Sequence, residues 1–246
     1  MNMKREKKVL GVIGGLGPWA TAHFLELVLG MTEADSEQEN LDMIVYNFPS
    51  IPDRTGYILG SNLKSPLPGL LSVARDLDRQ KVCCIAVPCI TAHFFYEDLS
   101  AAVTAPILNA VTETAARLQE AGITEAGIMA TDGTLVSGLL NGALARAGIH
   151  PILPSRQRQR DVMSLIYDDI KAGKPADMEK FHAVSGELRD RGAQTIVLGC
   201  TELSLIKRDE NIGPGYLDTM EVLARSSVLE CGKALKKEYR ELISRS

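Results

Sequence analysis

Short apolar runs recur along this chain, and segments with helical periodicity separate them. The runs are typical of strands buried on both faces of a parallel sheet. They cover residues 8–14, 42–48, 83–89, 105–110, 125–131, 195–200 and, with a weaker pattern, 215–218. The helical patterns cover residues 20–29, 68–79, 110–121, 134–147, 160–172, 176–191 and 219–237. This alternation predicts an α/β fold with parallel sheets.

The two halves of the sequence repeat one arrangement. A glycine-rich strand exit begins at Gly11 in the first half (GVIGGLG) and at Gly127 in the second (GIMATDG). In each half an apolar run ending in cysteine follows, and the two cysteines, Cys89 and Cys200, are 111 positions apart (200 − 89). We therefore expect two pseudo-symmetric three-layer α/β lobes with parallel sheets, each donating one cysteine from the carboxyl end of a strand.

These lobes define the predicted domains and the place of the site. The N-terminal lobe would comprise residues 1–108 plus 218–246, and the C-terminal lobe residues 109–217. The final helix, 219–237, would then pack back against the first lobe. Ligands of open α/β sheets bind at the carboxyl ends of the strands. We therefore expect the active site in the cleft between the lobes, with one thiol on each side.

The composition argues against several classes of partner. The 246 residues include 27 Lys and Arg against 31 Asp and Glu, which gives a net charge of −4 at pH 7 without a basic stripe. This charge, with an aromatic content of 5%, disfavours nucleic acid as the ligand. No apolar run approaches the ~20 residues that span a membrane. We expect a small-molecule substrate, with neither nucleic acid nor membrane as a partner.

The five cysteines do not form the pattern of a secreted disulfide protein. Their number is odd, and Cys83 and Cys84 are neighbours that would point to opposite faces of one strand. We interpret these two and Cys231 as ordinary buried thiols of a reduced, cytoplasmic protein. Cys89 and Cys200 differ, because each lies where a strand gives way to a loop and a threonine follows closely.

The N-terminal segment has two interpretations. Basic residues between positions 4 and 8 precede an apolar stretch that ends near Ala22, an arrangement that superficially resembles a secretion signal. Three glycines and Pro18 interrupt this stretch, which disfavours a signal helix. We therefore predict an ordinary first strand with a basic lead-in.

Two thiols across one cleft suggest a particular chemistry. Moving a proton from one face of a carbon to the other requires a base on one side and an acid on the other. Two equivalent groups that exchange roles do this in both directions. Where the carbon lies next to a carboxylate, the site must also neutralise the negative charge that builds there. Cationic and hydroxyl groups are therefore expected near Cys89 and Cys200.

Three segments supply such groups. The proline-flanked loop after the second strand carries Asp53, Arg54 and Thr55. An arginine can hold a carboxylate in bidentate fashion, although a solvated arginine on a surface turn would give the same sequence. Lys171 lies near a helix end, where it would either bind substrate or interact with the helix carbonyls. Thr134 lies near a helix N-terminus, either in an anion site or as an N-cap.

A dinucleotide cofactor is disfavoured. Gly15, Gly17 and Ala20 satisfy the G-x-G-x-x-G/A pattern after a strand. The acidic residue expected about 20 positions further on is missing. The second strand ends instead at Asn47, after a polar stretch.

A metal site in the cleft is also disfavoured. Cys89 with His93, and Cys200 with Glu202, have spacings that a zinc ion could use. No second histidine or cysteine stands at the usual spacing to complete a ligand set. We expect His93 to pack or bond locally, and we expect neither a cofactor nor a metal.

Six motifs carry a resemblance to a known family. They are GVIGGLGPWAT, IPDRT, PCITAH, ATDGT, IYDDIKAG and GCTEL, in this order, over about residues 9–230. In these motifs the chain resembles the aspartate/glutamate racemase family, and its aspartate racemase branch most closely. The paired PC-x-TAH and GCTE motifs are specific, and the others add order and spacing.

The resemblance implies a two-lobed homodimer that racemises an acidic amino acid, aspartate first and glutamate second, without pyridoxal phosphate or a metal. It implies Cys89 and Cys200 as the two acid/base thiols, with Cys200 acting on the L-substrate and Cys89 on the D-substrate. The predicted substrate-binding residues are Leu16, Asp53, Arg54, Thr55, Ile90, Thr91, Ala92, Thr134, Lys171, Thr201 and Glu202.

One position departs from the family pattern. The family usually has Cys-Asn-Thr at the first thiol, and this chain has Cys89-Ile90-Thr91. Ile90 has no hydrogen-bonding side chain, so a polar group of an aspartate-like substrate would stay unpaired, at a cost of ~1–3 kcal/mol. Glutamate or a sulfonated analogue is then a candidate. Two alternatives also stay open: an isomerase or hydantoin racemase that uses one thiol, and a binding protein without turnover.

Overall fold

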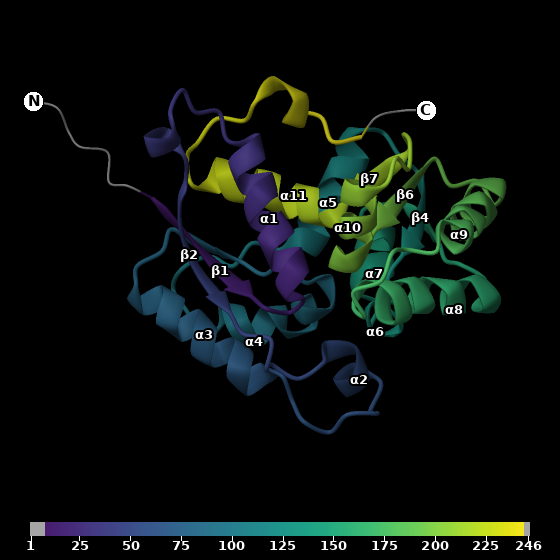
Figure 1. Cartoon of the computed structure of the whole chain (residues 1–246), viewed down its shortest axis with the longest axis horizontal. Helices are drawn as coiled ribbons and strands as arrows, with labels where there is room; N and C mark the ends of the chain where they lie inside the picture. The colour runs from purple at the N-terminus through teal and green to yellow at the C-terminus, as the bar shows by residue number, and fades with distance from the viewer. Residues whose placement is uncertain (1–7, 244–246) are drawn as a thin grey trace, which may run out of the picture.

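The computed structural model describes residues 8–243, and these contain one parallel sheet in each half of the chain (Figure 1). The first sheet has the strand order β2-β1-β3, with β1 (Val9–Gly14), β2 (Asp42–Asn47) and β3 (Cys84–Ala86). The second has the order β5-β4-β6-β7, with β4 (Glu125–Met129), β5 (His150–Ile152), β6 (Thr195–Leu198) and β7 (Tyr216–Asp218). All strand pairs are parallel, which confirms the predicted fold class.

Helices connect the strands. Those before the second sheet are α1 (Pro18–Met31), η1 (Glu37–Glu39), α2 (Arg54–Ile58), α3 (Leu67–Arg79), η2 (Ile90–Phe95), α4 (Tyr96–Ser100) and α5 (Ala110–Glu120). Those that follow are α6 (Asp132–Val136), α7 (Leu139–Arg146), α8 (Arg156–Ser164), the π-helical turn η3 (Leu165–Ile170), α9 (Met178–Asp190), α10 (Thr201–Asp209), α11 (Thr219–Glu230) and η4 (Lys237–Tyr239).

Each sheet has helices on both faces, so each lobe has three layers. The buried apolar side chains of α1, α5, α7 and α11 form one central core between the two sheets. The outer face of the first sheet is covered by α3, η2 and α4. The outer face of the second is covered by α8, η3, α9 and α10. The two lobes therefore share their inner layer, which fixes the position of one sheet relative to the other.

Alternation along the strands divides the apolar residues between these cores. In β1, Leu10 and Val12 belong to the central core and Ile13 to the outer one. In β4, Ile128 belongs to the central core and Met129 to the outer one. Successive side chains of a strand point to opposite faces, so a strand covered on both faces needs apolar residues at every position. This is why the runs in the sequence are continuous.

The two sheets have matching strand orders. The order β2-β1-β3 corresponds to β5-β4-β6. The counterpart of β7 is the segment around Ile107, which forms a single parallel bridge with Ile85. The prediction of a strand at residues 105–110 is therefore wrong. Pro106 has no N–H to donate. The segment makes two backbone hydrogen bonds with Ile85: the Pro106 carbonyl accepts from the Ile85 N–H, and the Leu108 N–H donates to the Ile85 carbonyl.

Two other differences have local causes. The short strand β5 was not predicted, because its three residues include Pro151 and the strand lies at the sheet edge, where proline is tolerated. The predicted helix 134–147 is broken into α6 and α7. Gly138 lies between them with φ 74°, a left-handed conformation that favours glycine.

The last long helix, α11, crosses between the lobes and packs against α1 and α5 (Figure 1). The predicted packing of this helix on the first lobe is confirmed, but the helix ends at Glu230 rather than at 237. Gly232, with φ 73°, follows its end, as is common at helix C-termini. The division of the chain at residues 108 and 218 stays a prediction.

The first strand has the predicted place, since Val9–Gly14 forms β1, while residues 1–7 of the basic lead-in lie outside the described part. Within residues 8–243, no helix combines the length and the apolar character that crossing a membrane requires. The expectation that Cys83 and Cys84 diverge is wrong. Cys83 precedes β3, outside the regular strand, and the two sulfurs lie 3.7 Å apart.

Candidate active site

The two predicted thiols occupy equivalent places in the two lobes. Cys89 comes soon after β3 and directly precedes η2, and Cys200 comes soon after β6 and directly precedes α10. Both have extended backbone, with φ/ψ of −164°/107° at Cys89 and −144°/137° at Cys200. Both are buried, with 7% and 6% of their surface exposed. The thiols therefore lie at the strand ends where α/β proteins bind ligands.

Cys200 is held by a carboxylate. Its Sγ donates a hydrogen bond to Oε2 of Glu202 at 2.9 Å, and the Thr201 hydroxyl donates to the same oxygen at 3.2 Å. Burial raises the pKa of the Cys200 thiol well above its usual range, the negative charge of Glu202 raises it further, and Lys171 acts in the opposite direction. Cys200 is thus a protonated thiol near neutral pH.

Lys171 links the carboxylates of both lobes. Its Nζ lies 4.0 Å from Oε1 of Glu202 and 3.7 Å from Oδ1 of Asp53, and its side chain is 27% exposed. It also lies 4.0 Å from the centre of the Tyr167 ring. Burial alone would lower the pKa of Lys171, but the negative charge of Glu202 raises it above its ordinary value. The ammonium group is therefore charged and faces the site.

Arg54 lies beside Cys89 and is itself buried, with 7% of its surface exposed. Its Nη2 donates to the carbonyl oxygen of Leu16 at 2.5 Å, and its Nη1 donates to that of Pro52 at 3.1 Å. Its Nε is buried and has no hydrogen-bond partner among the described residues. Burial alone would lower the pKa of Arg54, but Cys89 and Asp53 raise it. One donor of a fixed cation is therefore left open.

A cavity of about 430 Å³ joins these groups, a volume within the range of ligand sites. Its lining residues are Gly15, Leu16, Gly17, Pro18, Trp19, Ala20, Pro49, Ile51, Asp53, Arg54, Ile170, Lys171, Glu202 and Leu205. Cys89 and Cys200 are not among these lining residues. Each is in contact with one lining side chain, Cys89 with Arg54 and Cys200 with Glu202.

The sequence matches the model of the Asp/Glu/hydantoin racemase family over residues 13–226. The chain belongs to this family. The resemblance of the six motifs is thereby confirmed at the level of the family.

Three individual proteins that are similar to this chain carry the names of racemases. Picrophilus torridus aspartate racemase has a TM-score of 0.85 and 30% identity, over 96% of this chain and 99% of that one. Glutamate racemase from Francisella tularensis subsp. tularensis SCHU S4, in complex with D-glutamate, shares the fold with a TM-score of 0.65 and 17% identity, over 91% and 82% of the two chains. Broad specificity amino-acid racemase RacX of Bacillus subtilis (strain 168) is 24% identical over 227 residues, 89% of this chain and 96% of RacX.

The glycine-rich motif of this racemase family member is explained by close packing. Gly15 has φ 87°, and a Cβ there would lie 2.3 Å from the backbone nitrogen of Phe48. A Cβ at Gly17 would lie 3.0 Å from Oε1 of Glu202. The loop therefore packs against the segment after β2 and against the Cys200 side of the site. These contacts account for the glycines without a dinucleotide.

The predicted threonines meet across the lobes. Thr91 from η2 lies 3.0 Å from the hydroxyls of both Thr131 and Thr134, and the latter two lie 3.1 Å apart. All three are buried. The interpretation of Thr134 as an N-cap is wrong. Thr131 caps α6 by accepting from the Thr134 N–H, and Thr134 lies in the first turn. Thr131 was not among the predicted residues.

The loop with Asp53 is fixed by local and distant contacts. Asp53 caps α2 by accepting from the Gly56 N–H at 2.6 Å. It also accepts from the Tyr167 hydroxyl at 3.3 Å, across the lobes. Burial raises the pKa of Tyr167, and Thr55 is among its hydrogen-bond partners. Tyr167 was missed, although it lies in the quoted IYDDIKAG motif, because nothing local indicates which residue it contacts.

Of the predicted substrate-binding residues, Leu16, Asp53, Arg54, Lys171 and Glu202 line the cavity, and Thr55, Ile90, Thr91, Ala92, Thr134 and Thr201 do not. Ile90 is 2% exposed and belongs to the central core, and Ala92 is fully buried in the outer core of the first lobe. Neither lines the cavity. The apolar side chain at position 90 therefore packs in the central core between the two sheets.

His93 has a local role, as expected. Its Nδ1 lies 3.0 Å from the carbonyl oxygen of Cys89, and its Nε2 accepts from the Ala110 N–H at 3.1 Å. Since Nε2 accepts, Nδ1 carries the proton and donates. Burial lowers the pKa of His93. The neutral ring therefore ties the Cys89 backbone to the start of α5, and both nitrogens are engaged by the backbone.

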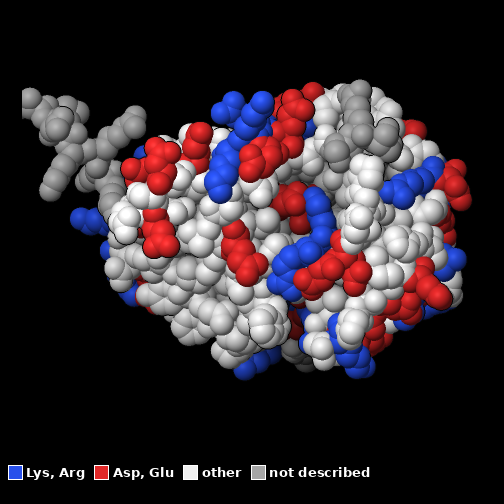
Figure 2. All heavy atoms as spheres, turned by 45° about the horizontal axis from the view of Figure 1, so that its top comes forward, with Lys and Arg blue, Asp and Glu red and all other residues white. Residues whose placement is uncertain are grey.

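Charged side chains of both signs lie close together on one face of the molecule and in the cavity. On the face shown in Figure 2, acidic and basic side chains are interspersed. Binding to a phosphate backbone depends on clustered positive charge. Inside the cavity, two cations and two carboxylates likewise alternate: Arg54, Asp53, Lys171 and Glu202.

Proposed function

We propose that this protein is a cofactor-independent racemase of an acidic amino acid, aspartate first and glutamate second, and that Cys89 and Cys200 are its two acid/base groups. One observation carries the proposal. Two buried thiols at equivalent strand ends each contact a charged side chain that lines one shared cavity, Arg54 for Cys89 and Glu202 for Cys200.

The two thiols differ in a way that suits two-sided proton transfer. Cys200 is protonated and donates to Glu202, so it begins as the acid. Arg54 lies beside Cys89, and we assign Cys89 the complementary role of the base, because two-sided proton transfer needs a base opposite the acid. Cys89 would take the Cα proton of the D-substrate, and Cys200 would return a proton to the opposite face. The reverse reaction begins after the two thiols have exchanged protonation states.

Arg54 is proposed to hold the carboxylate next to the reacting carbon. Its free Nε offers a donor at the site, while the carbonyls of Leu16 and Pro52 fix the rest of the guanidinium. Negative charge moves onto the carboxylate as the proton leaves, so a fixed cation stabilises the transition state more than the ground state. A buried cation needs no reorganisation when that charge develops.

Lys171 is proposed to bind the side-chain carboxylate of the substrate. It is already near Asp53 and Glu202, at 3.7 and 4.0 Å. A dicarboxylate would therefore compete with two protein carboxylates for one ammonium group. This competition favours a substrate with a second negative charge only if that charge comes closer to Nζ than the protein carboxylates do.

We further propose that the protein acts as a homodimer in the cytoplasm. The five cysteines are free in the structure, as a reducing compartment requires. Sedimentation of the purified chain would test the dimer.

The first experiment is proton NMR in deuterated water without added cofactor. L-Aspartate, D-aspartate and both glutamates are incubated with the protein, and the Cα–H signal is followed together with optical rotation. Loss of both for one acidic amino acid is the expected result. The Cys89→Ser/Cys200→Ser double variant is the blank, and it should leave both signals unchanged.

Other outcomes decide between the alternatives. Loss of the Cα–H signal with rotation retained would mean that only one thiol acts on that substrate. A covalent adduct on one cysteine, seen by intact mass, would favour an enzyme that uses a thiol as nucleophile. Exchange in the double variant equal to that of the unmodified protein would rule out the two-thiol mechanism.

A second candidate is a racemase of broad specificity, as the name of the B. subtilis relative describes. The apolar part of the cavity favours it: Leu16, Pro18, Ile51, Ile170 and Leu205 line it, and the Trp19 side chain beside them is 72% exposed. Such a wall accommodates a neutral side chain. The same NMR assay with leucine and methionine tests this, and faster exchange than with aspartate would favour the second candidate.

A further inference from the structure

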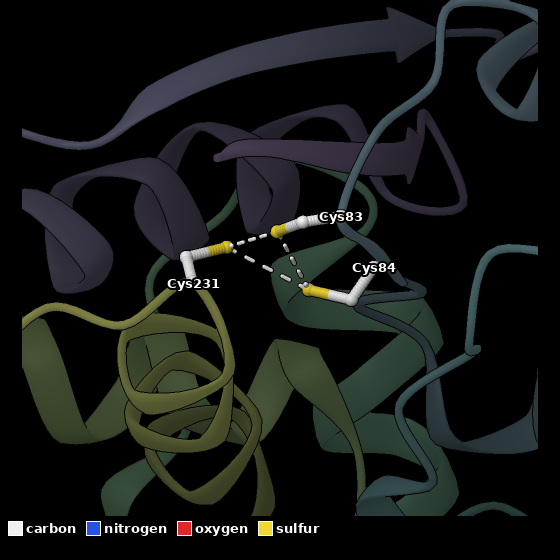
Figure 3. A group of neighbouring side chains, drawn as sticks. All are labelled: Cys83, Cys84 and Cys231. Carbon is white, nitrogen blue, oxygen red and sulfur yellow. Dashed lines mark hydrogen bonds between the residues drawn. The ribbon is translucent and has the colours of Figure 1, made fainter. Parts of the chain in front are cut away.

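Three cysteines converge on one point outside the cleft. The Sγ atoms of Cys83 and Cys231 lie 2.8 Å apart, and that of Cys84 lies 3.7 Å from each of them (Figure 3). Cys83 and Cys84 stand at the amino end of β3, and Cys231 follows α11. The group is therefore at the opposite end of β3 from Cys89. It joins segments that are 148 positions apart in the chain.

The arrangement is more specific than the burial of single thiols. A free cysteine often packs as a small apolar side chain, but here three side chains from two segments point toward one another (Figure 3). Cys84 is fully buried and Cys231 is 5% exposed, while Cys83 is only partly buried. Among residues 8–243, this group alone places three possible metal-ligand atoms within 4.8 Å of one another.

The sulfur separations suit a soft metal ion. With zinc–sulfur bonds of ~2.3 Å and tetrahedral geometry, sulfurs lie ~3.8 Å apart. Two of the three separations are 3.7 Å. The third, between Cys83 and Cys231, would have to open by about 1 Å to reach that value. Cys83 is the least buried of the three, so its side chain has room to move.

A cation lies near the three sulfurs. Nζ of Lys8 donates to the carbonyl oxygen of Glu230 at 3.0 Å, which holds it near the group. The thiolate is the form of cysteine that binds a metal.

We propose that Cys83, Cys84 and Cys231 bind one soft metal ion, Cu⁺ or Zn²⁺, through three thiolate sulfurs. Thiolates select such ions over Mg²⁺ and Ca²⁺, which take oxygen ligands. Zn²⁺ would add a water as its fourth ligand. Each thiol that is still protonated releases its proton to solvent on binding. The ion would tie the start of β3 to the end of α11 and so stabilise the central core.

Metal titration of the reduced, metal-free protein tests this. Zn²⁺ and Cu⁺ are added separately in competition with a coloured chelator, in the absence of oxygen. We expect one ion of at least one kind per chain, release of protons into a weak buffer, and a rise in Tm. Cys83→Ser should weaken binding at least 100-fold and abolish the rise in Tm.

A matched control separates this group from the cleft. The Cys89→Ser/Cys200→Ser double variant keeps all three sulfurs of the group and should bind as the unmodified protein does, although it has fewer thiols than Cys83→Ser. The partly exposed position of Cys83 should tolerate serine, and Cys231→Ala provides a second variant with the same expected loss. Circular dichroism checks that each variant folds.

Two outcomes would overturn the proposal. They are no stoichiometric binding of either ion, and binding that is lost in the double variant but kept in Cys83→Ser. None of these readouts depends on racemase activity, so the test is independent of the proposed function.

Discussion

The two thiols have the same place in the fold and different surroundings. Both follow the strand that neighbours the central strand of their sheet, β3 for Cys89 and β6 for Cys200. Beside Cys89 lies the guanidinium of Arg54, and beside Cys200 lie the carboxylate of Glu202 and the ammonium of Lys171. The repeat thus fixes two symmetric positions, and individual side chains make them electrostatically unequal. An acid/base pair needs this inequality, because one member must hold a proton while the other accepts one.

A second pair of equivalent positions shows the same contrast. Asn109 follows the Ile107 bridge and caps α5, and Asp218 ends β7 and caps α11. Both side chains accept hydrogen bonds from the first turn of their helix. Asn109 is neutral, but burial, and then the charge of Glu221, raises the pKa of Asp218 to about 7. The same capping geometry is therefore pH-dependent in one lobe only.

The largest expected effect comes from removing one thiol at a time. Cys89→Ser and Cys200→Ser should each lower racemisation at least ~10³-fold, because acid/base groups contribute ~10²–10⁴. Each variant should still exchange the Cα proton of one enantiomer, the D-form with Cys200→Ser and the L-form with Cys89→Ser. Deuterium incorporation into each enantiomer measures this. Racemisation at the unmodified rate in either variant contradicts the pair.

Glu202→Gln should make the two thiol sites more alike. Without the carboxylate charge, the pKa of Cys200 falls, so its alkylation by iodoacetamide should begin at lower pH. We expect racemisation to decrease by roughly 10–100-fold, because Cys200 loses the hydrogen bond to the Glu202 carboxylate that positions its thiol. Peptide mass spectrometry after alkylation locates the reacted thiol. Asp53→Asn is the control, since Asp53 also lies near Lys171 but the structure gives it no contact with Cys200. An equal shift in both variants would contradict a specific role for Glu202.

Asp218→Asn should make the two caps alike. The pKa of Asp218 is about 7 in the folded protein and about 3.9 in the unfolded chain. The folded state therefore binds the proton more tightly, and this contribution to stability is complete below pH ~4 and lost as the pH rises to 7. The variant should remove that decline and be more stable by roughly 2–4 kcal/mol at pH 8. Urea unfolding at pH 4 and pH 8 tests it, and an unchanged pH dependence contradicts it.

Thr91→Val should have the smallest effect. It removes a hydroxyl that bonds to Thr131 and Thr134 across the lobes, and we expect a loss of about 1 kcal/mol in the free energy of unfolding. Thr112→Val is the control, because Thr112 is exposed and bonds only within its own helix. Urea unfolding compares the two variants. A loss no larger than that of the control would show that the threonine contacts contribute nothing to lobe association.

The sequence predicted the buried strands better than the short or proline-containing segments. Continuous apolar runs are set by burial on both faces, a local property, so β1, β4 and β6 could be located directly. The segment 105–110 has the same composition, but Pro106 prevents a full ladder. The strand β5 was missed because three residues with a proline carry no periodic signal. The same limit applies to the short helices α2 and α4.

For the site, the sequence indicated which residues could take part in catalysis or binding, but not how their side chains are arranged. The position of Cys89 and Cys200 at strand ends follows from local pattern. Packing between distant segments decides the other features. It brings Tyr167 to Asp53 and Thr91 to Thr131, and it places Ile90 in the core. These pairs are separated by many positions in the chain, and no periodicity encodes them.

The sequence by itself determined the α/β repeat, the family and the two thiols, because strand burial and short motifs are read within a few residues. Tertiary structure alone decided the charges around each thiol and the meeting of Cys83, Cys84 and Cys231. The physical reason is the same in both cases. Electrostatic and coordination chemistry depend on separations of a few ångströms between side chains, and only the packing of the two lobes around their shared core sets those separations.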